Sequence, residues 1–258
     1  MTGDLKIEIL LFYYDRPKMA MDFAVASVLN SDYENWFLSV IDDSSDQNSE
    51  ELIHELIRRG DKYSHTLEKK ITIIKTGDTL QAKEERGGSM FGYSANTAIK
   101  EHSNADIWLM LCDDDALHKT YLSKLNKYYL ENPKAIYSYC LVSIFDPKNF
   151  KDIWNLYETS ELQEPTKNFI GPMLNLSGEI DTGCCKVDAS QVSWRRENFL
   201  KDKIAFAYPK TKDLDADLYT KMSNAWGACQ ENKILGQYKA WFEDQLGSRE
   251  SWYKTLEN

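Results

Sequence analysis

The chain has 258 residues, of which 42% are hydrophobic and 28% are charged. These proportions exclude a disordered chain and are those of a globular protein large enough to bury one α/β core. The formal charge of −10 argues against nucleic acid as the main partner, because an acidic surface repels phosphate backbones. It does not exclude small anionic ligands, since a bound divalent cation reverses the local field.

The five cysteines form no CxxC pair and no zinc-finger spacing with histidine. Cys184 and Cys185 are adjacent, which is poor geometry for a disulfide, so we expect reduced thiols in a cytoplasmic compartment. The N-terminus lacks the basic and long apolar regions of a signal peptide. The early apolar run, residues 9–14, is too short to cross a bilayer, so we expect no transmembrane segment and at most peripheral membrane contact.

In chain order, buried-strand patterns alternate with helical spacing in the first half of the sequence. This alternation predicts an α/β fold, with a mostly parallel sheet and helices on both faces. The expected strands are residues 7–14, 37–41, 71–74 and 107–111, and the expected helices are residues 17–29, 50–59, 89–102 and 120–130.

The second half is less regular. Residues 146–172 form a long excursion, which we interpret as a loop over the site, and residues 213–222 have helical spacing. A further helical pattern over residues 238–256 predicts a C-terminal helical extension, 226–258, after a catalytic domain of residues 1–225. One side of this pattern is apolar, which favours packing on the core, although an acceptor-side cap or a membrane-surface helix stays open.

The acidic triplet Asp113-Asp114-Asp115 directly follows the expected strand 107–111. Ligands of such sheets bind beyond the carboxyl ends of the strands. Adjacent carboxylates repel one another, and a hard cation such as Mn²⁺ or Mg²⁺ relieves this repulsion and can bind a diphosphate. The alternative is a solvated acidic turn, with Asp115 capping the helix that begins near Thr120.

A second acidic pair, Asp42-Asp43, follows the expected strand 37–41, where a carboxylate can accept hydrogen bonds from a nucleobase or a ribose. Its alternative is an ordinary Asp/Ser-rich turn. At the end of the first strand, Tyr14 could stack on a base and Arg16 could face a phosphate, and ordinary core and surface roles are the alternative. Arg86 lies in a basic Arg-Gly-Gly loop that could approach the same diphosphate.

Several segments together resemble family 2 glycosyltransferases with the GT-A fold, over about residues 5–135. They are Tyr14-Asp15-Arg16-Pro17, Val40-Ile41-Asp42-Asp43-Ser44-Ser45, Ser94-Ala95-Asn96-Thr97-Ala98-Ile99, and the run from Asp106 to Leu117. Cys112 departs from the resemblance, because many members have Asp there.

The resemblance implies a nucleotide-sugar-binding half, 1–118, and an acceptor-binding half, 119–225. In the donor half, Asp42 or Asp43 would hold the base, Asp113 would contact the ribose or the metal, and Asp115 would bind the metal. Asp114 and Asn96 would lie beside the donor.

Inverting members of the family also use a downstream Asp as general base for the acceptor hydroxyl. Asp215 fits this position, with Asp213 and Asp217 as alternates, although Leu214 stands where Glu is usual. Acidic residues at a helix start are the structural alternative.

On the acceptor side we place Asp181 and Gly183, together with Trp194 and Arg195, which are equally compatible with structural roles. The sequence thus predicts a metal-dependent, inverting glycosyltransferase that uses a nucleotide-sugar donor, UDP-linked in preference, and a glycan or other hydroxyl acceptor. A nucleotidyltransferase-like enzyme and a catalytically silent sugar-nucleotide or glycan-binding domain are the alternatives.

Overall fold

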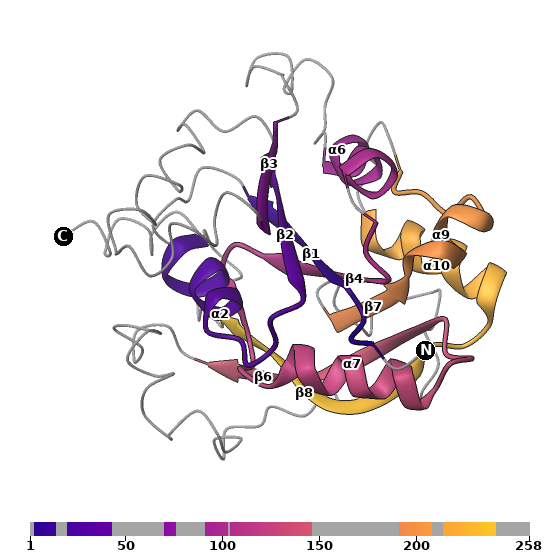
Figure 1. Ribbon diagram of the computed structural model, residues 1–258. Coiled ribbons are helices and arrows are strands. Elements are labelled where there is room, and N and C mark those ends of the chain that lie inside the picture. Colours follow the sequence, from indigo (N-terminus) through magenta and orange to yellow (C-terminus); the bar gives the residue numbers. More distant parts are fainter. Residues whose placement is uncertain are drawn as a thin grey trace.

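The computed structural model (Figure 1) describes residues 3–13, 20–42, 70–75, 91–102, 104–145, 191–207 and 214–240. The strands within these ranges are β1 (Ile7–Tyr13), β2 (Trp36–Asp42), β3 (Ile71–Lys75), β4 (Ile107–Cys112), β5 (Asp115–Leu117), β6 (Tyr137–Phe145), β7 (Val192–Arg195) and β8 (Gln230–Ala240). The helical segments are the π-helical turns η1 (Ala20–Val25) and η2 (Ala98–His102) and the α-helices α2 (Ala26–Leu29), α6 (Phe91–Thr97), α7 (Tyr121–Glu131), α9 (Arg196–Lys201) and α10 (Leu214–Trp226).

The strands form one eight-stranded sheet in the order β3-β2-β1-β4-β7-β6-β8-β5. The first four strands in this order are parallel to one another, as the sequence predicts. Further along the sheet, β7 runs antiparallel to β4 and β6, β8 is parallel to β6, and β5 is antiparallel to β8. The expected helix 50–59 and the excursion 146–172 lie outside the described residues.

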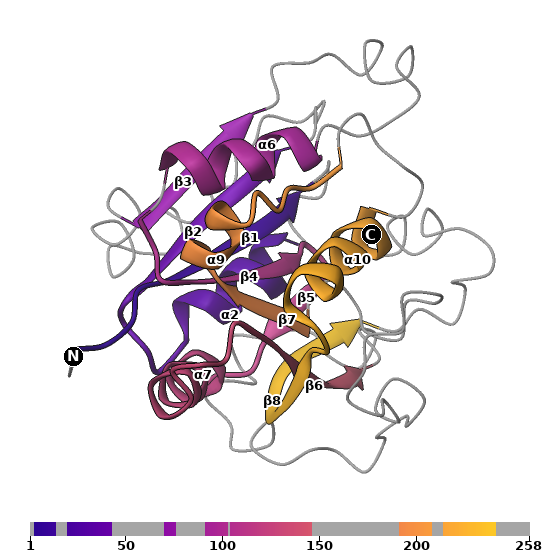
Figure 2. The ribbon, with the colours of Figure 1, turned by 90° about the vertical axis from the view of Figure 1, so that its right-hand side faces the viewer.

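Helices cover both faces of the sheet, with α2 and α7 on one face and α6, α9 and α10 on the other (Figures 1 and 2). The side chains of strand β1 point alternately to the two faces of the sheet, so β1 contributes to the buried cluster on each face. Ile9 packs in one buried cluster with Val28 and Leu125, while Leu10 packs in the other with Phe199 and other residues of the opposite helices. The predicted layer arrangement is confirmed.

The predicted C-terminal helical extension is wrong for the part that the structure describes. Residues 230–240 form strand β8 within the main sheet, and Tyr238, where the helical pattern begins, pairs with Ser143 of β6 and Ala116 of β5. The backbone hydrogen bonds offered by these two strands outweigh the helical spacing of the side chains. Residues 241–258 lie outside the described ranges.

Candidate functional site

The carboxyl ends of three parallel strands bring the two acidic segments to one edge of the sheet. Tyr13, the last residue of β1, is in register with Asp42 of β2, and Phe12 is in register with Cys112 of β4. Asp42 and the residues after Cys112 therefore lie two strand spacings apart, about 10 Å. The predicted placement of both acidic segments at strand carboxyl ends is confirmed.

The acidic triplet forms the turn between β4 and β5. Asp113 and Asp114 make the turn, and Asp115 begins β5, where it is in antiparallel register with Lys239 of β8. Helix α7 starts later, and its N-cap residue is Thr120. Asp115 is therefore a strand residue, and its alternative role as a helix cap is excluded.

Contacts from α2 and β8 hold short strand β5 in place, and β8 is itself bonded to β4. Its Leu117 backbone N–H donates to Ser27 Oγ of α2 at 2.9 Å, and the His118 N–H donates to the Gly236 carbonyl of β8 at 2.8 Å. The buried Gln237 side chain donates from Nε2 to the Met110 carbonyl of β4 at 3.2 Å. These contacts fix the direction in which the chain leaves the acidic turn.

All three carboxylates of the triplet are buried, with exposed fractions of 5% for Asp113, 9% for Asp114 and 2% for Asp115. Ligand atoms of Asp114, Asp115 and the Cys112 thiol lie within 4.8 Å of one another. Burying several negative charges together is unfavourable unless positive charge or hydrogen bonds compensate. Carboxylate oxygens at this spacing fit a divalent cation such as Mn²⁺ or Mg²⁺.

The sequence prediction of Asp113 and Asp115 as metal ligands matches this group only through Asp115. Among the side chains that the structure describes, Asp113 is buried beside the group but is not one of its members. Cys112 is a member that was not predicted from the sequence. The signal available in the sequence was its position directly before the triplet.

Among the other predicted donor-side residues, Asp42 is 4% exposed at the end of β2. Asn96 lies in α6, where its side-chain amide bonds to the backbone of Phe206: Nδ2 donates to the Phe206 carbonyl at 3.0 Å, and Oδ1 accepts from the Phe206 N–H at 2.9 Å. The remaining donor-side and acceptor-side predictions outside the described ranges are Tyr14, Arg16, Asp43, Arg86, Asp181 and Gly183.

The proposed general base lies at the start of α10. Asp215 is the second residue of this helix, and its side chain is not among those described. Asp217, an alternate, has its carboxylate 2.6 Å from the Lys221 ammonium within the same helix. Asp213 lies outside the described ranges. The choice of Asp215 as general base therefore stays a prediction.

Trp194 and Arg195 lie in β7, and the contacts described for both side chains are with other parts of the fold. Trp194 is fully buried and stacks on Phe199 with ring centroids 5.7 Å apart, so neither ring face is open to a sugar. Arg195 donates from Nε to the Ala135 carbonyl and from a terminal nitrogen to the Tyr129 carbonyl, each at 2.9 Å. This geometry fits structural roles for Trp194 and Arg195, and it does not fit the predicted role in binding the acceptor.

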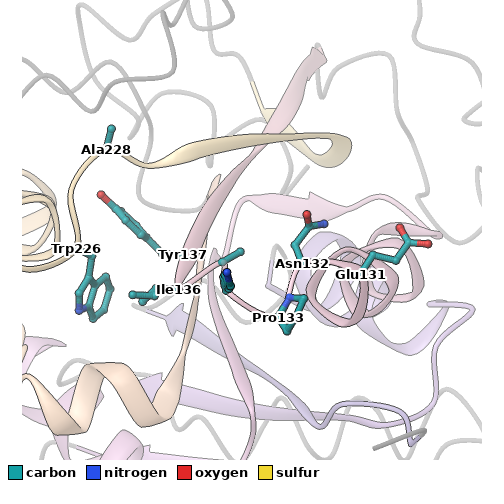
Figure 3. Close-up of a pocket in the computed structure, with 9 residues that line it drawn as sticks. Glu131, Asn132, Pro133, Ile136, Tyr137, Trp226 and Ala228 are labelled. Atoms are coloured by element: carbon teal, nitrogen blue, oxygen red, sulfur yellow. The ribbon is translucent and has the colours of Figure 1, made fainter.

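A cavity of about 430 Å³ lies between the end of α7 and the start of β6, with Trp226 and Tyr137 on one side and Glu131 and Asn132 on the other (Figure 3). Tyr137 is in register with Trp194, which pairs with Trp108 near the start of β4. The acidic turn follows the opposite end of β4. This cavity is therefore separate from the acidic site.

The order of strands, the acidic turn after β4 and the acidic end of β2 agree with one sequence family. The profile described as "Glycosyl transferase family 2" matches residues 9–187. The chain belongs to this family. Among curated proteins, none matches the sequence.

Solved structures similar to this family 2 member share the GT-A fold. S. aureus TarS 1–349 in complex with UDP is 14% identical, with a TM-score of 0.60 over 98% of this chain and 63% of that chain. The same TarS fragment in complex with UDP-GlcNAc is 13% identical, with a TM-score of 0.59 over 96% of this chain and 61% of that one.

A third similar structure is the mannosyltransferase PcManGT from Pyrobaculum calidifontis in complex with GDP-Man and Mn²⁺. It is 12% identical, with a TM-score of 0.56 over 100% of this chain and 66% of that chain. The chain spans about 60% of the length of the TarS fragment that it matches. No helix in the described part of the chain is long and apolar enough to cross a membrane.

Proposed function

We propose that this glycosyltransferase moves a sugar from a nucleoside-diphosphate sugar, UDP-linked in preference, to a hydroxyl group of a glycan or similar acceptor, with inversion at the anomeric carbon. The observation that carries the proposal is the buried acidic turn beside the end of β1, at the same sheet edge as Asp42. The nucleotide sugars in the names of the similar structures, UDP-GlcNAc and GDP-Man, support this donor class.

In this proposal the donor lies across the carboxyl ends of β2, β1 and β4. The Asp42 carboxylate accepts hydrogen bonds from the base or the ribose, as could the neighbouring Asp43, and Tyr14 and Arg16 flank the base and the phosphates. Asp115, with Asp113 or Asp114, would hold Mn²⁺ or Mg²⁺. When bound, that ion supplies positive charge to the diphosphate as it leaves.

Asp215 then acts on the acceptor. Its carboxylate accepts the proton of the attacking hydroxyl while that oxygen forms a bond to the anomeric carbon. The bond between the anomeric carbon and the diphosphate oxygen breaks, and the nucleoside diphosphate departs with the electron pair. Burial of the acidic turn strengthens these electrostatic interactions by keeping water away.

Among the described residues, Cys112, Cys140 and Cys229 form no disulfide, and Cys112 lies in the acidic group itself. Oxidation there would remove a possible ligand atom from the site. This supports our proposal that the enzyme works in a reducing, cytoplasmic compartment.

A thermal-shift panel of nucleotide sugars with and without Mn²⁺ tests the donor. A ligand that binds only the folded state raises the melting temperature, so one nucleoside class should stabilise the protein in a metal-dependent manner. Product analysis with that donor should then yield a nucleoside diphosphate. Pyrophosphate release would identify a nucleotidyltransferase instead, and tight binding without any turnover would identify a silent binding domain.

A further inference from the structure

Residues 204–207, which lie between α9 and α10, are bonded to α6 through Asn96. An Asn side chain carries one carbonyl acceptor and an amide donor, as a peptide unit does. Asn96 uses both on one residue, because it accepts from the Phe206 N–H at 2.9 Å and donates to the Phe206 carbonyl at 3.0 Å. The two bonds satisfy backbone groups that no strand or helix partner serves in this segment.

The same segment packs closely on the preceding turn of α6. A Cβ atom added at Gly92 would lie 2.2 Å from the Ala207 carbonyl oxygen, so only glycine permits this approach. The Phe206 side chain is 3% exposed, and its ring packs edge-on against Phe12 of β1 with centroids 6.2 Å apart. The segment is thus fixed against the donor half of the fold.

Lys221 connects the other side of the segment to α10. Its ammonium donates to the Ala205 carbonyl at 3.1 Å and lies 2.6 Å from the Asp217 carboxylate. Asp217 is two residues after the proposed base, Asp215, in the first turns of α10. A continuous set of polar contacts therefore runs from α6 through residues 204–207 to the start of α10.

We propose that Asn96 and Lys221 are positioning residues that hold the start of α10, and the general base on it, at a fixed place relative to the donor half. Asn96, Lys221 and residues 204–207 together form what we call the interhelix clamp. The inference rests on the proposed function for the role of Asp215. Its physical basis is that a base must lie within hydrogen-bond reach of the proton it accepts, so a small displacement of α10 slows the reaction.

The test compares Asn96→Ala and Lys221→Met with two matched controls. Thr97→Ala removes a side-chain hydrogen bond, 3.1 Å long, that stays within α6, and Lys127→Met removes an i,i+4 ion pair with Glu131 in α7. We expect the clamp variants to lower kcat about 10- to 100-fold while the donor KM stays within about twofold. Lys221→Arg, which keeps the cation, should recover most of kcat.

Hydrogen exchange gives a readout that does not depend on activity. In Asn96→Ala, the amides of residues 204–207 and of 218–222 in α10 should exchange faster than in Thr97→Ala. Unchanged exchange, or unchanged kcat in folded clamp variants of an active enzyme, overturns the interhelix clamp. Equal loss of kcat in the controls also overturns it. Absence of sugar transfer by the unmodified protein would instead contradict the proposed function, and the exchange result would still decide the structural claim.

Discussion

Gly236 of β8 lies so close to Cys140 of β6 that a Cβ atom on the glycine would be 2.4 Å from the cysteine sulfur. The same atom would be 2.9 Å from the ring of Tyr121 in α7. The carbonyl of Gly236 accepts the hydrogen bond from His118 that closes the end of β5. The close approach of β8 to β6 therefore helps to set the position of the strand that begins with Asp115.

Gly236→Ala should destabilise the fold, because the added methyl group forces the backbone of β8 away from Cys140 and Tyr121. Overpacking of this kind costs about 1–3 kcal/mol in the free energy of unfolding. Urea denaturation measures the change, and Gly3→Ala is the control, since a Cβ there meets nothing within 4 Å. Equal stability of the two variants would show that β8 can shift without cost.

The parallel half of the sheet could be predicted from sequence because β1, β2 and β4 are short, mostly apolar runs that are buried on both faces, and β3 is a shorter, partly buried run at the edge. Strands β1, β2, β3 and β4 were all expected within two residues of their bounds. The acidic residues at the end of β2 and directly after β4 could be located for the same reason. Their common edge follows from parallel pairing alone.

The remaining half depends on pairing that the local sequence does not reveal. β5 has three residues and exists because β8 pairs with it, and β8 contains Tyr238, whose neighbours show helical spacing. Local patterns also could not reveal that Asn96 would bond to a residue 110 positions later. The same applies to Trp194, since an aromatic residue beside two arginines fits a core position as well as a sugar-binding one.

Asp42→Ala should weaken nucleotide binding. The carboxylate is 4% exposed at the end of β2, and hydrogen bonds to a buried charged acceptor contribute about 1.5–3 kcal/mol. We expect the Kd for the nucleoside diphosphate to rise about 10- to 100-fold, measured by calorimetry in the presence of Mn²⁺. Asp32→Asn, an exposed residue bonded to Ser123, should bind normally. An unchanged Kd for Asp42→Ala would remove this residue from the donor site.

Alkaline pH should destabilise the protein through its buried tyrosines. Burial raises the pKa of the Tyr129 hydroxyl above its ordinary value of 10.0, and burial acts in the same direction on Tyr121. The unfolded chain therefore loses these protons first as the pH rises past 10. Their contribution to stability is complete below that pH and is lost above it, by about 1.4 kcal/mol per pH unit for each hydroxyl.

Tyr129→Phe isolates one of these groups. The variant should be less stable at neutral pH, because the hydroxyl donates to the Ser193 carbonyl at 2.9 Å, but its stability should fall less steeply above pH 10. Tyr93→Phe is the control for the substitution itself, since Tyr93 is 50% exposed. Equal slopes in all three proteins, measured by denaturation at several pH values, would contradict the prediction.

Asp115→Asn should abolish metal-dependent transfer while leaving the fold intact. Asp115 is 2% exposed, and asparagine has nearly the same size, so the packing is kept. The substitution removes the negative charge from the acidic group, in which the ligand atoms of Asp115, Cys112 and Asp114 lie within 4.8 Å of one another. We expect kcat to fall by about 100-fold or more, and the stabilisation by Mn²⁺ in thermal-shift measurements to disappear. Asp106→Asn is the matched control, because Asp106 lies directly before β4, at the end opposite the acidic turn. The hydrogen bond described for its carboxylate is the one that it accepts from the Lys6 N–H. Retained activity and metal response in Asp115→Asn would contradict the assignment of the cation site to the turn that joins β4 to β5. Among the described residues, Asp115 is the buried carboxylate that begins a strand at this edge.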